Sequence, residues 1–243
     1  FILKYGGRFR EISESHIKYL HDRSFFKKID SHKKAYWLGF MYADGNVYQN
    51  KMQISLAKED CHMLELFKKH MKSEHKLYKD GDHFKFLINS EELVKDLKKL
   101  GCHPRKSLTL KFPNKKQVPR KYINSFILGY FDGDGCIQYL KQADRKGRRD
   151  KNHGNQRWVF QIISTKEFIR SLEKVFKPIA KNRTITIYKE KRTKENVWYM
   201  TMGGGCTKRE SKELPIRIYK YLYPNINFSL KRKKDKFIQI IKH

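Results

Sequence analysis

The chain has 243 residues, with 55 Lys and Arg against 25 Asp and Glu, and a formal net charge of +30. This length permits one large domain or two of ordinary size, and a hydrophobic content of 39% excludes a disordered basic tail. The basic excess is spread along the chain, so nucleic acid is the expected partner. The absence of a long uncharged apolar run and of a signal peptide argues against a membrane partner and predicts a soluble intracellular protein.

The N-terminal stretch, residues 1–32, is polar and weakly periodic, and we interpret it as an extension that precedes the main fold. The start at Phe1 instead of Met indicates a piece of a longer protein. The first half of the fold is then expected at residues 33–114.

The first half is predicted to have the element order αββαββα. An apolar helix is expected from Lys33 to Ala43, and the alternation around Ile54 indicates a strand with one buried face. A helix follows at residues 59–71, then strands at 75–78 and 83–88. The last helix begins after Ser90 and is stopped by Gly101.

The second half, expected at residues 115–243, repeats this order. Pro119 is predicted to open its first helix. Residues 53–59 resemble residues 161–167 at an offset of 108, and the match continues into the following helix. The helices that precede these strands are only 90 residues apart, so the second half contains an insertion, which we assign to the basic, glycine-containing loop at 141–157. The run from Gly203 to Gly205 lacks the context of a nucleotide-binding loop and is predicted to be a flexible turn.

The strongest signal is a repeated apolar pattern that ends in Asp-Gly, WLGFMYADG at residues 37–45 and ILGYFDGDG at 127–135. Small residues lie four apart in each copy, which gives each helix a strip where a second helix can approach closely. If these strips face each other, Asp44 and Asp134 meet at the negative ends of the two helices. Two carboxylates in that position require cations.

These two copies resemble the motif of the LAGLIDADG homing endonucleases, and the resemblance covers roughly residues 33 to 240. It implies an α+β fold in which two pseudo-symmetric αββαββα halves pack through the motif helices and two antiparallel sheets form a DNA-binding saddle. It further implies a monomer without an obligate protein partner, which binds double-stranded DNA. The implied activity is metal-dependent, site-specific cleavage of both strands at a long asymmetric target. An intron-encoded or free-standing enzyme of a bacterial, phage or organellar system is expected.

The resemblance also assigns the catalytic centre. Asp44 and Asp134 are the expected metal ligands, with the backbone carbonyls of Ala43 and Gly133 as further ligands, because Mg²⁺ prefers carboxylate, carbonyl and water oxygens. Mn²⁺ is an alternative cofactor, and Ca²⁺ is expected to bind without supporting cleavage.

The family places a lysine near each centre. The matching positions are Lys106 and Lys233, where a cation can stabilise charge on the phosphate. Lys231 is an alternative to Lys233, and an ordinary phosphate contact is an alternative role for either lysine. Tyr42 replaces the first aspartate of the motif, whereas the second copy keeps Asp132, which we interpret as a structural or capping group.

Base recognition is expected from outward-facing strand residues, because a β-ribbon fits the major groove and presents alternate side chains to base edges. A half-exposed sheet face without a role in binding is the alternative. The candidates are Asn46, Tyr48, Gln53, Ser55, Gln138, Gln161, Thr184, Thr186 and Tyr188, with Lys141, Arg145 and Arg148 of the basic loop as contacts to the DNA backbone.

Two other functions are compatible with parts of the sequence. A LAGLIDADG-type RNA maturase or a non-cleaving, sequence-specific DNA-binding protein keeps the scaffold, but such proteins tend to lose one motif carboxylate, and here both are present. A general basic nucleic-acid-binding protein accounts for the charge but leaves the repeated motif unexplained.

Overall fold

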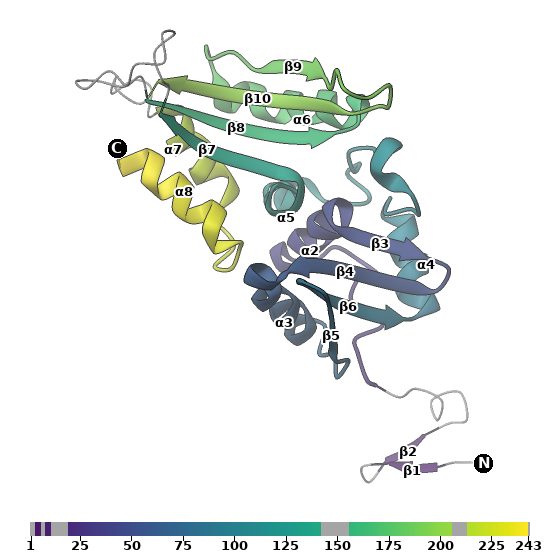
Figure 1. Cartoon of the computed structure of the whole chain (residues 1–243). Coiled ribbons are helices and arrows are strands. Elements are labelled where there is room, and N and C mark those ends of the chain that lie inside the picture. Colours follow the sequence, from purple (N-terminus) through teal and green to yellow (C-terminus); the bar gives the residue numbers. More distant parts are fainter. Residues whose placement is uncertain (1–2, 6–7, 11–18, 142–155, 206–212, 243) are drawn as a thin grey trace.

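The computed structural model describes residues 3–5, 8–10, 19–141, 156–205 and 213–242. Two four-stranded antiparallel sheets lie on either side of a central pair of helices, α2 (His32–Ala43) and α5 (Ile123–Asp134) (Figure 1). Each sheet comes from one half of the chain. The structure therefore confirms the expected α+β fold of two αββαββα halves packed through the motif helices. Within the described chain, no helix has the length and apolar character that crossing a bilayer requires.

The first half begins with α2, whose N-terminus is capped by Ser31: the Ser31 Oγ accepts a hydrogen bond from the Lys34 amide. Its sheet has the order β3-β4-β6-β5, and Ser90 caps the last helix in the same way through the Leu93 amide. The remaining elements of this half are β3 (Gly45–Tyr48), β4 (Lys51–Ala57), η1 (Lys58–Asp60), α3 (Cys61–His70), β5 (Leu77–Asp80), β6 (His83–Asn89) and α4 (Glu91–Lys99).

The second half repeats this order with the sheet β7-β8-β10-β9, and it ends in one helix more than the sequence predicted. Its elements after α5 are β7 (Gly135–Lys141), β8 (Gln156–Ser164), α6 (Lys166–Ala180), β9 (Thr186–Lys189), β10 (Trp198–Gly205), α7 (Glu213–Leu222) and the additional α8 (Lys231–Lys242). A short hairpin, β1 (Leu3–Tyr5) and β2 (Arg8–Arg10), lies in the N-terminal part. The basic loop predicted between β7 and β8 falls largely on residues 142–155, outside the described residues.

Two local predictions are wrong. Pro119 does not open α5: its carbonyl accepts a 2.9 Å hydrogen bond from the Tyr122 amide, which makes a 3₁₀ turn, η3 (Arg120–Tyr122), and the α-helix begins at Ile123. The glycine run is not a turn, because Gly203 to Gly205 form the end of strand β10 and pair with β8. A Cβ atom on Gly203 would lie 2.8 Å from the Trp158 carbonyl oxygen, so the close approach of the backbones explains this glycine.

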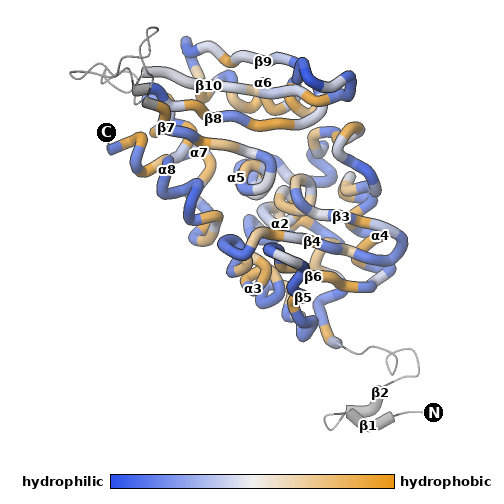
Figure 2. The backbone as a smooth tube through the Cα atoms, viewed as in Figure 1, coloured by the Kyte–Doolittle hydropathy of each residue, from blue (hydrophilic) through white to orange (hydrophobic). Residues whose placement is uncertain are grey.

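The core extends through both halves and includes the segment before α2. Phe25 and Phe26 are buried, and their rings lie 6.1 and 6.2 Å from that of Phe67 on α3, so residues of the predicted extension complete the core of the first half. In Figure 2, hydrophobic and hydrophilic residues alternate along α8, in agreement with the burial of Phe237 and Ile240 on one face.

Candidate active site between the two halves

The motif helices α2 and α5 touch through their backbones. A Cβ atom on Gly39 would lie 1.9 Å from the Phe126 carbonyl oxygen, and one on Gly129 would lie 1.9 Å from the Tyr36 carbonyl oxygen. Only glycine fits at these two positions. The small-residue strips therefore face each other, as the repeated pattern predicted.

This packing brings the acidic ends of both motifs to one place. Asp44 follows the last residue of α2, where its amide donates to the Phe40 carbonyl, and Asp134 is the last residue of α5. A Cβ atom on Gly133 would lie 2.3 Å from the Ala43 Cβ and 3.1 Å from Asp44 Oδ2. The Asp44 carboxylate thus lies against the residue that precedes Asp134.

The two carboxylates disfavour each other's charge. Burial of the group, followed by the like charge of Asp134, raises the pKa of Asp44 to about 6, and Lys233 and Lys106 oppose this rise. The Asp44 residue keeps contact with solvent, which weakens the effect of burial on its carboxyl group, whereas the charge of Asp134 raises the pKa of Asp44 independently of burial. Burial also raises the pKa of Asp134, against a hydrogen bond from Tyr130 and the two lysines. A bound cation would reduce the repulsion between the two negatively charged carboxylates.

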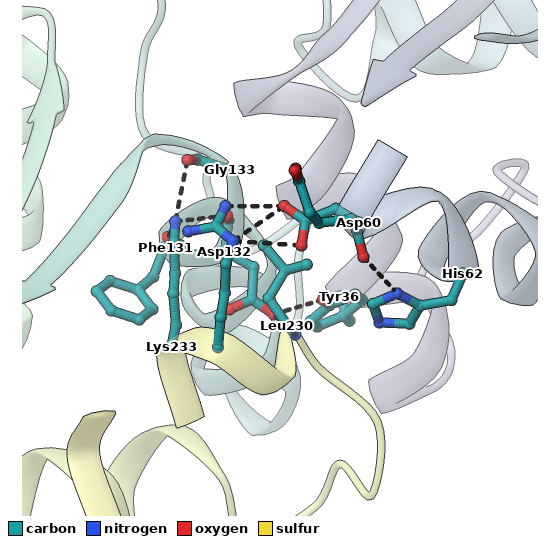
Figure 3. A network of polar contacts seen from close by, with 10 residues as sticks. Tyr36, Asp60, His62, Phe131, Asp132, Gly133, Leu230 and Lys233 are labelled. Carbon is teal, nitrogen blue, oxygen red and sulfur yellow. Dashed lines mark hydrogen bonds and ion pairs between the residues drawn. The ribbon is translucent and has the colours of Figure 1, made fainter. Parts of the chain in front are cut away.

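Each half places one buried lysine at the C-terminal end of its own motif helix. The Lys106 Nζ donates to the carbonyls of Ala43, at 3.3 Å, and Gly45. The Lys233 Nζ donates to the carbonyls of Phe131, Asp132 and Gly133 at 2.7, 2.5 and 3.1 Å (Figure 3). A cation is favoured here because the helix C-terminus carries partial negative charge.

The structure also distinguishes the two lysine candidates of the second half. Lys233 is 4% exposed, whereas Lys231 is exposed and has no corresponding contact with α5 among the described residues. Burial lowers the pKa of Lys233 to about 8, and the Asp132 carboxylate opposes that change.

The donors at this site fit a hard divalent cation. Among the described residues, no group of three or more His, Cys, Asp or Glu side chains is arranged to hold a metal, and the two carboxylates that lie near each other here are those of Asp44 and Asp134. Mg²⁺ binds in this way, through one or two carboxylates, with water and phosphate oxygens completing its shell. The carbonyls of Ala43 and Gly133 already accept hydrogen bonds from the lysines, which leaves each one further lone pair for a cation.

Asp132 and Tyr42 lie at equivalent positions of the two motifs but point into the protein. Asp132 is 1% exposed, and its Oδ2 accepts hydrogen bonds from the Tyr36 hydroxyl at 2.5 Å and the Leu230 amide at 2.9 Å. The buried Tyr42 hydroxyl donates to the Leu100 carbonyl. Both are structural contacts, in agreement with the interpretation of Asp132 as a capping group.

The predicted base-reading residues occupy the outward faces of the two sheets. Asn46 pairs with Gln53, and each alternates along its strand with a buried residue. The exposed candidates are Asn46, Tyr48, Gln138, Thr184, Thr186 and Tyr188, and the half-buried ones are Gln53, Ser55 and Gln161. Thr184 precedes β9 and is not in a strand. Lys141 ends β7, while its side chain, with Arg145 and Arg148, lies outside the described residues.

Several other residues of these outward faces were not predicted from the sequence. Lys85 on β6 pairs with Ser55 on one side and Tyr78 on the other, and it forms an ion pair with Asp80. The signal was present in the alternation with buried Phe86 and Ile88. Further residues of these faces are Lys51, Leu87 and Asn89 in the first sheet and Arg157, Tyr199 and Thr201 in the second.

No protein-family model and no curated protein matches the sequence. Solved structures do match. The meganuclease I-SmaMI bound to uncleavable DNA superposes with a TM-score of 0.59 at 14% identity, over 86% of this chain and 88% of that one. The LAGLIDADG homing endonuclease I-LtrWI bound to target DNA gives 0.57 at 14% identity over 90% of each chain. The LAGLIDADG meganuclease I-AabMI bound to uncleaved DNA gives 0.54 at 12% identity over 85% and 89%. The chain therefore has the two-domain LAGLIDADG homing endonuclease fold.

Proposed function

We propose that this protein is a monomeric, metal-dependent endonuclease that cuts both strands of DNA at one long asymmetric site. The observation that carries the proposal is the meeting of Asp44 and Asp134, one from each half, at the same end of two touching helices. Each half contributes one carboxylate and one buried lysine, which gives one set of catalytic groups for each of the two DNA strands. A single chain supplies both sets.

Solved structures of the same fold support this activity. I-LtrWI is bound to its target DNA, and I-SmaMI is also known bound to cleaved DNA, with a TM-score of 0.50 at 15% identity over 85% of this chain and 95% of that one. The net charge of +30 supports DNA binding as well, because Lys and Arg contacts to phosphate release counterions.

The residues have separate roles in the proposed reaction. Asp44 and Asp134 would hold Mg²⁺ or Mn²⁺, with the carbonyls of Ala43 and Gly133 as further oxygen ligands. Such an ion, when bound, would supply Lewis-acid activation of water and would neutralise charge on the leaving oxygen. Lys106 and Lys233 keep positive charge beside the position of the phosphate, where negative charge develops in the transition state.

Cleavage of a selected target tests the proposal. Cleavable sites are first selected from a randomised DNA library with Mg²⁺ present. Asp44→Asn and Asp134→Asn should each abolish double-strand cleavage and keep DNA affinity close to that of the wild type, whereas Asp235→Asn, a change at an exposed acid of α8, should cut normally. Full cutting by both active-site variants would refute the proposal. Binding of the selected DNA or of intron RNA, without cleavage by the wild type, would favour the maturase or DNA-binding alternatives.

A further inference from the structure

The two motifs differ at one position, where the first has Tyr42 and the second has Asp132. We infer that both are positioning residues, each of which ties the chain segment that carries the active-site lysine of its half to the motif helix. Asp132 would position Lys233, and Tyr42 would position Lys106. This inference rests on the proposed endonuclease activity and deepens it.

In the second half, the contacts form a closed loop between α5 and the first turn of α8 (Figure 3). The Asp132 carboxylate accepts from the Leu230 amide at 2.9 Å, and the Leu230 carbonyl accepts from the Lys233 amide at 3.0 Å. The Lys233 Nζ then returns to the Asp132 carbonyl at 2.5 Å. Leu230 is 1% exposed, so no water competes for its amide. The Asp132 side chain therefore fixes the residue at which α8 begins, one turn from the ammonium group.

In the first half, the corresponding closed set of hydrogen bonds contains the Tyr42 hydroxyl. The Tyr42 hydroxyl donates to the carbonyl of Leu100, at the end of α4. Gly101 follows with a φ of +98°, and a Cβ atom there would lie 2.1 Å from the Tyr42 oxygen. Cys102 then donates to the Met41 carbonyl at 3.5 Å, and Lys106 returns to the end of α2 at Ala43. Tyr42 thus holds the start of the segment that leads to Lys106.

The helix end that each residue meets explains the difference in residue type. Asp132 faces the N-terminus of α8, which presents free amide donors and partial positive charge, so a carboxylate is the suitable partner. Tyr42 faces the C-terminus of α4, which presents free carbonyls, so a hydroxyl donor is required. An aspartate at position 42 would place an acceptor against an acceptor, next to the negative end of a helix. The first motif therefore has Tyr42 in place of an aspartate because its partner is a helix C-terminus, that of α4.

The test measures the rate at which each DNA strand is cut, with a doubly end-labelled target in single-turnover reactions of the full chain. Lys233→Ala and Lys106→Ala first identify the strand that depends on each lysine. Asp132→Ala should slow the strand that Lys233→Ala slows, and Tyr42→Phe should slow the other strand, each by about 10- to 100-fold relative to its partner strand. Asp132→Asn keeps an acceptor for the Leu230 amide and should recover most of the lost rate. Nicked DNA should accumulate with opposite polarity in Asp132→Ala and Tyr42→Phe.

Ser125→Ala is the matched control. Ser125 is fully buried near the opposite end of α5, where its hydroxyl bonds to His32 Nδ1 at 2.8 Å, so its loss should lower stability without strand bias. Tyr42→Asp, which restores the motif, should be less stable than Tyr42→Phe and show the same strand bias. Equal slowing of both strands by Asp132→Ala or Tyr42→Phe would overturn the inference. If Asp132→Ala does not fold, the strand bias of Tyr42→Phe decides the inference, since this change keeps the shape of the side chain and removes only the hydroxyl. Unimpaired cutting by Asp44→Asn and Asp134→Asn would instead contradict the proposed function itself.

Discussion

Gly129 of α5 lies directly against the Tyr36 carbonyl of α2, so close that a Cβ atom on this glycine would be 1.9 Å from the oxygen. The same relationship joins Gly39 to the Phe126 carbonyl on the other side of the pseudo-twofold axis. Two backbone contacts thus fix the spacing of the helices. Since both motif carboxylates extend from these helices, the contacts also fix the distance between Asp44 and Asp134.

Gly129→Ala and Gly39→Ala should therefore lower the free energy of unfolding, each by more than about 3 kcal/mol, because a methyl group would force the helix backbones apart. Urea denaturation followed by circular dichroism measures the loss. Gly204→Ala is the control, since its added Cβ would have its nearest neighbour, Trp158 Nε1, at an ordinary 3.5 Å. Wild-type stability in Gly129→Ala would show that the helices do not pack as described.

Elements with a strong local pattern could be predicted from the sequence. The helix before Asp44 was expected within one residue of its observed ends, and the strand around Ile54 was expected with the buried face that it has, because repeated small residues and apolar alternation leave few alternatives. Side chains whose roles depend on distant partners could not be predicted. Tyr42 looks like an unexplained departure until α4 is seen to end against it.

The glycine run at 203–205 and the Asp60–Arg232 ion pair between the halves could not be predicted for the same reason. Glycine at position 203 indicates a turn when read locally, and its strand pairing becomes visible only with the Trp158 carbonyl in place. Asp60 and Arg232 are 172 residues apart, and no periodicity relates them. Tertiary contacts of this kind carry no signal in one sequence.

The stability of the metal-free protein should depend on pH through Asp44. Its pKa is about 6 in the folded protein and 3.8 in an unperturbed chain, so between these values the folded state retains a proton that the unfolded chain has released. The contribution of Asp44 to stability is therefore greatest below about pH 4, falls as the pH rises to about 6, and stays low above that.

Asp44→Asn removes this penalty, so the variant should melt at a higher temperature than the wild type at about pH 7.5 in EDTA, with a smaller difference at about pH 4. Melting curves at both pH values measure the effect. Mg²⁺ at neutral pH should stabilise the wild type more than the variant, because only the wild type offers both carboxylates. A difference between the proteins that is independent of pH would contradict the electrostatic account.

The ion pair between Asp60 and Arg232 should couple the two halves energetically. The Arg232 Nε and Nη2 lie 3.0 and 2.9 Å from Asp60 Oδ2, and they join the beginning of α3 to α8. The Arg232 side chain is 54% exposed, so screening limits the expected coupling energy to about 1 kcal/mol. A double-mutant cycle with Asp60→Asn and Arg232→Met, measured by urea unfolding, gives this energy. The exposed Arg170–Glu173 pair within α6 is the control, with an expected coupling of about 0.3 kcal/mol, and an equal value for both pairs would argue against a specific link between the halves.

Gln161 should read one base of the target, and its neighbours determine which bases it accepts. Its amide nitrogen donates to the Tyr188 hydroxyl at 2.8 Å and to Thr201 Oγ1 at 3.2 Å, beside a recess of about 390 Å³ lined by Tyr188, Lys189 and Tyr199 among others. Both amide hydrogens are thereby used, and only the oxygen remains to bind DNA. In the major groove, the hydrogen-bond donors are the exocyclic amines of adenine and cytosine, whereas guanine and thymine present acceptors.

We therefore expect a preference for adenine or cytosine at one position of the half-site that the second sheet contacts. Gln161→Leu should remove that preference, worth about 1–3 kcal/mol, without changing other positions, and Thr186→Val on the same row of the sheet should leave it intact. Cleavage rates on targets carrying each of the four base pairs at every position provide the measurement. The combined change Thr201→Val and Tyr188→Phe removes the two hydroxyl groups that accept from the Gln161 amide, so that an amide hydrogen can donate to adenine N7 while the Gln161 oxygen accepts from adenine N6. Its preference should narrow to adenine, and an unaltered profile in both Gln161→Leu and the combined variant would show that Gln161 does not contact a base.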